Sequence, residues 1–145
     1  MKIVLMSMLA VLVVGLVSLE VRAVDPSSKI ICGTNEENEI WCTNVHEMEQ
    51  GKWERVPGEL KQVIVRGGRL WGVNKNNEIY YAADIRNPHW VRLAGEAKEI
   101  SEGGGVLCGV NLKDEVFCAE KGIDTPRPEW HIAPHHASLK FISVD

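Results

Sequence analysis

The chain repeats one pattern of apolar and polar positions three times. In its clearest form, apolar and aromatic residues at 70–73 and 79–81 flank the sequence Lys75-Asn76-Asn77. Runs of β-branched and aromatic residues around a short turn that needs a left-handed backbone position predict a β-hairpin. The same pattern occurs at residues 32–42 and 108–118. The sequence therefore predicts a repeat protein.

Two further landmarks recur once the hairpins are aligned on Gly33, Gly72 and Gly109, which are roughly 40 residues apart, a spacing found in solenoids and propellers. A tryptophan follows each hairpin, and a run of alternating character lies at residues 60–65, 97–101 and 139–144. The tryptophans are Trp53, Trp90 and Trp130. Each unit is thus expected to hold four short strands, which is typical of a β-propeller blade.

The predicted fold class is all-β, with β-propeller-type repeats of four-stranded blades. Residues 24–57 supply strands two to four of a first blade, and residues 59–95 and 96–134 supply two complete blades. Residues 139–144 supply one inner strand, which is the strand that the first blade lacks. Closed propellers have four to eight blades, but this chain has three blades' worth of strands. Three arrangements stay open: a strained three-bladed monomer, an open arc, and a half propeller that forms a homodimer by exchange of terminal strands.

The first 23 of the 145 residues lie before the repeats and do not share their pattern. They combine an early lysine, an apolar run at residues 3–19 and a small residue, Ala23, which together predict a secretory signal peptide. A membrane anchor is the alternative, but the apolar run is at the short end for a span. We expect residues 24–145 to form one secreted, extracellular domain without stable membrane insertion.

The charge pattern excludes some classes of function. The net charge is −4, and beyond the predicted signal peptide no basic run longer than two residues occurs, so nucleic acid is not an expected partner. No nucleophile elbow, phosphate-binding glycine loop or His-Glu zinc helix is present. We therefore do not expect an enzyme.

The four cysteines fall at matching hairpin positions. Pairing strands about the turns places Cys32 opposite Cys42 and Cys108 opposite Cys118, whereas the middle repeat holds Trp71 and Tyr81 at the same two sites. Cross-strand neighbours have the short separation that a disulfide needs. Zinc is the competing interpretation, but the spacing fits a zinc finger poorly and the expected compartment is oxidising. Two disulfides, and no metal site, are predicted.

Candidate ligand-binding residues lie where the repeats differ from one another. The repeated asparagines at the turns fit backbone caps better than ligand groups, and the repeated tryptophans fit packing between blades better than platforms for sugar rings. The variable positions are in the turns and in the long connections at residues 43–52, 84–89 and 120–129. The candidates are Lys75, Asn76, Asn77, Lys113, Asp114 and His89.

Most of residues 30–144, in all three repeats, resemble a known family. Trp53-Glu-Arg-Val-Pro-Gly-Glu-Leu-Lys-Gln-Val-Ile-Val, Leu70-Trp-Gly-Val-Asn and Glu78-Ile-Tyr-Tyr are similar to the tectonin repeat of lectins such as fish-egg lectins. The resemblance implies a secreted β-propeller lectin that binds sugars or bacterial lipopolysaccharide in innate defence or in an egg. The residues show no acidic calcium loop, so no cofactor is expected from them; calcium is implied only by the resemblance, because some relatives are associated with it.

Two functions from different classes follow. The first is carbohydrate recognition, in which weak sites on several blades gain affinity through multivalency. The alternative is a protein-binding or structural component of the egg envelope or another extracellular scaffold.

Overall fold

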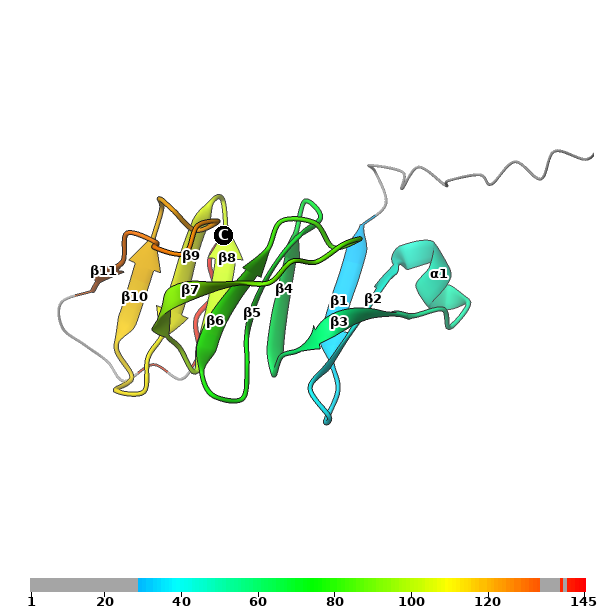
Figure 1. The fold of residues 1–145 in the computed structure, drawn as a ribbon, viewed down its shortest axis with the longest axis horizontal. Helices are drawn as coiled ribbons and strands as arrows, with labels where there is room; N and C mark the ends of the chain where they lie inside the picture. The colour runs from blue at the N-terminus through cyan, green and yellow to red at the C-terminus, as the bar shows by residue number, and fades with distance from the viewer. Residues whose placement is uncertain (1–28, 134–138, 140) are drawn as a thin grey trace, which may run out of the picture.

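Three antiparallel sheets lie side by side, one for each repeat (Figure 1). A computed structural model describes residues 29–133, 139 and 141–145. The predicted signal peptide at residues 1–23 lies outside the described residues. Within the described part of the chain, no helix has the length and apolar character needed to cross a membrane.

The middle and last sheets each have four strands, and the first has three. In spatial order, the first sheet consists of β1 (Ile30–Thr34), β2 (Glu39–Asn44) and β3 (Glu54–Glu59). The second consists of β4 (Gln62–Arg66), β5 (Arg69–Val73), β6 (Glu78–Ala82) and β7 (Val91–Glu96). The third consists of β8 (Glu99–Gly103), β9 (Val106–Val110), β10 (Val116–Ala119) and β11 (His131–Ile132). The predicted all-β repeats of four-stranded, propeller-type blades are confirmed.

The hairpin turns have the predicted geometry. Asn77 ends its turn in the left-handed region with φ of 63°, and Asn38 and Asp114 hold the same place with φ of 63° and 64°. Asn and Asp tolerate this region because their short side chains bond to nearby backbone. The turns therefore fix the register that places Cys32 opposite Cys42 and Cys108 opposite Cys118. Both pairs are joined as disulfides, as predicted.

The hydrophobic core lies in two layers, one at each junction between sheets. Residues of the middle sheet alternate between these layers, so that Leu70 faces the first sheet and Trp71 faces the third. This explains why the run at 70–73 is apolar at successive positions, all of which are buried. A strand covered on both faces has no polar side to present to water.

A tryptophan clamps each junction. The Trp90 indole N–H donates to the Pro57 carbonyl of the preceding sheet at 2.7 Å, and Trp130 does the same to the Ala94 carbonyl at 2.6 Å. Each indole lies over a glycine of the preceding sheet, Gly58 or Gly95. The predicted role of these tryptophans in packing between blades is thus confirmed for Trp90 and Trp130. Trp53 begins the array and is 41% exposed.

Residues 139–144 are predicted to supply the strand that the first sheet lacks, but within one copy of the chain their described part does not reach that sheet. The described part of residues 139–144 sits beside β8, at the third sheet, and does not pair with β1 (Figure 1). The Ile142 N–H donates to Glu99 Oε1 at 3.4 Å, and the Val144 N–H donates to Ser101 Oγ at 3.0 Å. Residues 141–145 have no assigned strand.

A short helix, α1 (Val45–Glu49), occupies the first long connection, where the sequence predicted only a loop. Asn44 caps its N-terminus by accepting a hydrogen bond from the Glu47 N–H at 2.9 Å. A helix of five residues is too short to show an apolar period. Its cap is the feature of the sequence that could have indicated it.

Candidate functional site

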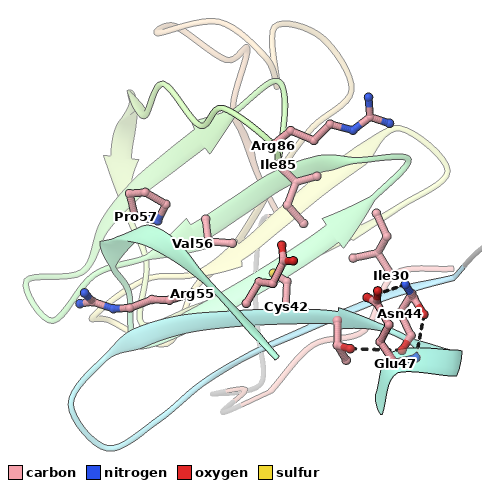
Figure 2. Close-up of a pocket in the computed structure, with 11 residues that line it drawn as sticks. Ile30, Cys42, Asn44, Glu47, Arg55, Val56, Pro57, Ile85 and Arg86 are labelled. Carbon is pink, nitrogen blue, oxygen red and sulfur yellow. Dashed lines mark hydrogen bonds between the residues drawn. The ribbon is translucent and has the colours of Figure 1, made fainter. Parts of the chain in front are cut away.

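The junction between the first and second sheets contains a pocket of about 210 Å³ (Figure 2). Its floor is formed by Cys42 and Val56 of the first sheet, and Ile85 lies in the connection that follows β6. We call it the junction pocket. It is lined by Ile30, Cys42, Thr43, Asn44, Glu47, Glu54, Arg55, Val56, Pro57, Ile85 and Arg86.

The pocket exists because a disulfide is smaller than a pair of aromatic rings. At the second junction, Trp71 and Tyr81 occupy the positions that Cys32 and Cys42 hold in the first sheet. Their ring centroids are 5.2 Å apart, and the Trp71 indole N–H donates to the Ile123 carbonyl at 2.8 Å. The aromatic pair thus reaches the connection that covers the second junction, whereas the disulfide residue Cys42 borders a pocket at the first.

The rim of the junction pocket is polar. Asn44 Nδ2 donates to Glu47 Oε2 at 2.7 Å, which holds an amide and a carboxylate together on one side. Arg55 and Arg86 lie on other sides, and their guanidinium groups point outward (Figure 2). Arg55 also pairs with Glu39 at 3.2 Å. An apolar floor with a few convergent polar groups is the usual composition of a small-ligand site.

The predicted ligand residues of the turns have mostly structural surroundings. Asn77 Oδ1 accepts a hydrogen bond from Lys61, and Asp114 pairs with Lys98 in the same way. Burial lowers the pKa of Lys61. Lys75, Asn76 and Lys113 are exposed. Of the five candidates at the two turns, three have exposed side chains, and the other two, Asn77 and Asp114, already bond to a lysine of the protein.

The structure does not bring all six candidates together. The turn with Lys75, Asn76 and Asn77 precedes β6, whereas His89 follows it, so the length of a strand separates them. Figure 1 shows the turns before β6 and β10 on the same side of the array. His89 lies on the other side, near Asn87, whose Nδ2 is 3.4 Å from His89 Nε2. None of the six lines the junction pocket.

Sequence reasoning named two of the connections that form the junction pocket, but not its residues. Thr43, Asn44 and Glu47 come from the connection at 43–52, and Ile85 and Arg86 come from 84–89. The signal that pointed there was the difference in these connections among repeats. The contribution of β3 was missed, because its residues match those of the other repeats.

The repeated polar residues at the turns form a cap, as expected. Asn74 Oδ1 accepts from the Asn76 and Glu78 N–H groups at 3.0 and 2.9 Å, and Asn74 Nδ2 donates to Glu78 Oε2 at 2.8 Å. The hydrogen bonds from Asn74 and then from Tyr80 lower the pKa of Glu78. The pKa of Glu39 is lowered likewise, first by Asn35 and then by Trp41.

The arrangement of potential metal-ligating side chains bears on the calcium that the family resemblance allows. Among residues 29–133, 139 and 141–145, no three His, Cys, Asp or Glu side chains gather in a way that could hold an ion.

Antiparallel four-stranded sheets clamped in series by tryptophans define a propeller-type repeat protein. The chain belongs to the tectonin domain family, which matches residues 16–145. This match confirms the resemblance seen in the sequence.

Individual relatives cover shorter stretches. Tectonin-1 of Physarum polycephalum is 42% identical over 48 residues, which are 30% of this chain and 22% of that protein. The N-terminal domain of Nup159 aligns with 67% of this chain and 25% of that chain, with a TM-score of 0.46 and 13% identity. The chain thus spans about a quarter or less of each of these two proteins.

Proposed function

We propose that this protein is a secreted lectin and that the junction pocket binds a sugar residue, either as free carbohydrate or as part of bacterial lipopolysaccharide. The observation that carries the proposal is the polar-rimmed junction pocket in a member of the tectonin domain family. Two disulfides are consistent with an oxidising, extracellular compartment. Innate defence or protection of an egg is the proposed setting.

The chemistry of the junction pocket suits a sugar ring. Asn44 and Glu47 present an amide and a carboxylate, which accept and donate hydrogen bonds as sugar hydroxyls require. The floor at Val56 and Ile85 offers contact to the apolar C–H face of a ring. A volume of about 210 Å³ is below the usual range of drug-sized ligands, so one sugar unit rather than a chain is the proposed occupant.

The first experiment measures retention of the folded, disulfide-bonded protein on immobilised monosaccharides and on lipopolysaccharide. We expect weak, saturable binding that free sugar inhibits, with avidity on dense surfaces. Failure to bind any member of a broad glycan and lipopolysaccharide array would overturn the proposal. Capture of a specific extracellular protein in excess free sugar would instead support the scaffold alternative.

A second experiment tests the junction pocket itself. Replacing Cys32 by Trp and Cys42 by Tyr copies the pair that fills the second junction, and should abolish sugar retention. The matched control replaces both cysteines by Ala, which removes the same disulfide without filling the space and should retain binding. Equal binding by the two variants would place the sugar elsewhere, even if the wild-type protein is a lectin.

Replacing a single arginine is a milder test of the junction pocket. Arg86→Ala should weaken retention because Arg86 lines the junction pocket. Arg127→Ala removes an exposed arginine from the corresponding connection of the third repeat and should have no effect. An equal loss in both variants would indicate general electrostatic attraction to the matrix rather than a site.

A further inference from the structure

The two ends of the array are complementary to each other. Among the described residues, the first sheet has no inner strand, so β1 has a strand neighbour on one side only within its sheet. The third sheet carries an additional segment, residues 141–145, beside its inner strand β8. The third sheet therefore carries a segment that could supply the inner strand missing from the first sheet.

The C-terminal segment occupies the place that the inner strand of a fourth sheet would have. Between the second and third sheets, the Ile100 N–H donates to Gln62 Oε1 at 2.9 Å. The Ile142 N–H donates in the same manner to Glu99 Oε1, and Glu99 is the residue of β8 that corresponds to Gln62 of β4. The repeat that sets β8 beside β4 thus also sets residues 141–145 beside β8. This segment therefore lies where the inner strand of a further sheet would lie.

The tryptophan clamp gives an independent observation. Trp90 and Trp130 each donate to a carbonyl of the preceding sheet, whereas the sheet that contains β3, next to Trp53, is the first among the described residues. Trp53 is 41% exposed, and Phe141 at the other end is 79% exposed. Trp53 and Phe141 thus leave apolar surface uncovered at the two ends of the described array.

We propose that a second copy of this chain docks head to tail on each end, so that residues 141–144 of one copy complete the first sheet of the other. The register follows from the complete sheets, where Gln62 pairs with Val73 and Val63 with Gly72. By correspondence, Phe141 would face Thr34, and Ile142 would face Gly33, across the interface. Trp53 would lie at the interface, on the side of the third sheet of the other copy that carries its outer strand β11.

Two copies satisfy the geometry of a closed ring. Each copy contributes three sheets, and the resulting six lie within the range of four to eight found in closed propellers. The two head-to-tail contacts are then related by a two-fold axis, and β1 gains a second strand neighbour in each copy. This assembly does not depend on whether the protein binds sugars.

The partner would also complete a hollow beside the second disulfide. Val106, Cys118 and Glu120 line a space of about 400 Å³ that corresponds to the junction pocket at Ile30, Cys42 and Asn44. The wall that Ile85 and Arg86 supply at the junction pocket has no counterpart among its described lining residues. In the ring, the connection containing α1 of the second copy would supply that wall.

Molar mass in solution tests the proposal, measured by light scattering on the disulfide-bonded protein over a range of concentrations. The wild type should have the mass of two chains. Deletion of residues 139–145 should give one chain, and Trp53→Ala should raise the dimer dissociation constant about tenfold or more. Leu112→Ala is the matched control. Leu112 is 60% exposed. Its counterpart in the middle sheet, Lys75, is exposed even though that sheet has a neighbouring sheet on each side, so docking of a second copy should not cover Leu112.

A cross-link tests the register independently of the deletion, which could impair folding. Benzoylphenylalanine replaces Phe141, and isotopically light and heavy copies are mixed before irradiation. We expect cross-links between copies to β1 peptides near Thr34. A monomeric wild type, a dimer that survives both the deletion and Trp53→Ala, or cross-links only within one chain would overturn the proposal.

Discussion

The contact between Trp90 and Gly58 provides a sharp test of how the sheets are held together. A Cβ atom at Gly58 would lie 2.6 Å from Trp90 Nε1. The backbone angle φ at Gly58 is 125°, a value that residues with a side chain rarely adopt. Gly58→Ala is therefore expected to strain the backbone and to push the indole away from the Pro57 carbonyl, to which it donates at 2.7 Å. Both effects weaken the first junction.

The magnitude follows from these two contributions. A residue held in a sparsely populated backbone region costs about 1–3 kcal/mol, and a lost hydrogen bond costs about 1 kcal/mol. Gly58→Ala should thus lower the free energy of unfolding by about 2–4 kcal/mol. Gly51→Ala is the control, because its φ is 68° and nothing lies within 4 Å of its Cβ position. It should cost about 1–2 kcal/mol.

Urea denaturation at a fixed protein concentration measures both values. Trp90→Phe removes the indole N–H, so in that background Gly58→Ala should lose the hydrogen-bond contribution and cost about 1 kcal/mol less. Equal costs for Gly58→Ala and Gly51→Ala, together with no coupling between Gly58 and Trp90, would refute the argument that the indole clamps this junction.

Two further predictions concern the third and second sheets. Replacing Cys108 and Cys118 by Ala opens a bridge with a sequence separation of 10, and should lower the free energy of unfolding by about 3 kcal/mol on the chain-entropy estimate; unchanged urea denaturation would contradict it. Asn74→Ala should raise the pKa of Glu78 toward the ordinary glutamate value of about 4.3, as followed by NMR titration of its carboxyl group. Because the fold lowers this pKa, the carboxylate contributes stability above about pH 4.3 that is lost as the pH falls through the lowered value, and Asn74→Ala should flatten this acid dependence. An unmoved Glu78 titration would show that the Asn74 amide does not set it.

Local pattern was sufficient to predict the sheets. The turn chemistry at Asn77 fixed a hairpin register, and that register alone paired Cys32 with Cys42. These features depend on residues close in sequence, whose geometry a turn type determines. The same reasoning extended to Trp90 because every repeat carries its equivalent.

Features formed between repeats were harder to predict. The junction pocket depends on the volume of side chains from two sheets, and the sequence did not indicate that a disulfide at Cys42 would leave space that Tyr81 fills elsewhere. The position of residues 139–144 also depends on a neighbouring sheet rather than on local pattern, because the same strand sequence fits beside β1 or β8.

The tryptophan clamp has a consequence for how such chains change length. Trp130 belongs to one repeat, and the carbonyl it meets, that of Ala94, belongs to the repeat before it. A duplicated repeat therefore arrives with a donor for the unit before it and an acceptor for the unit after it. Gain or loss of whole repeats leaves every remaining joint intact, so arrays of different length can arise by recombination at the gene level without redesign of any contact.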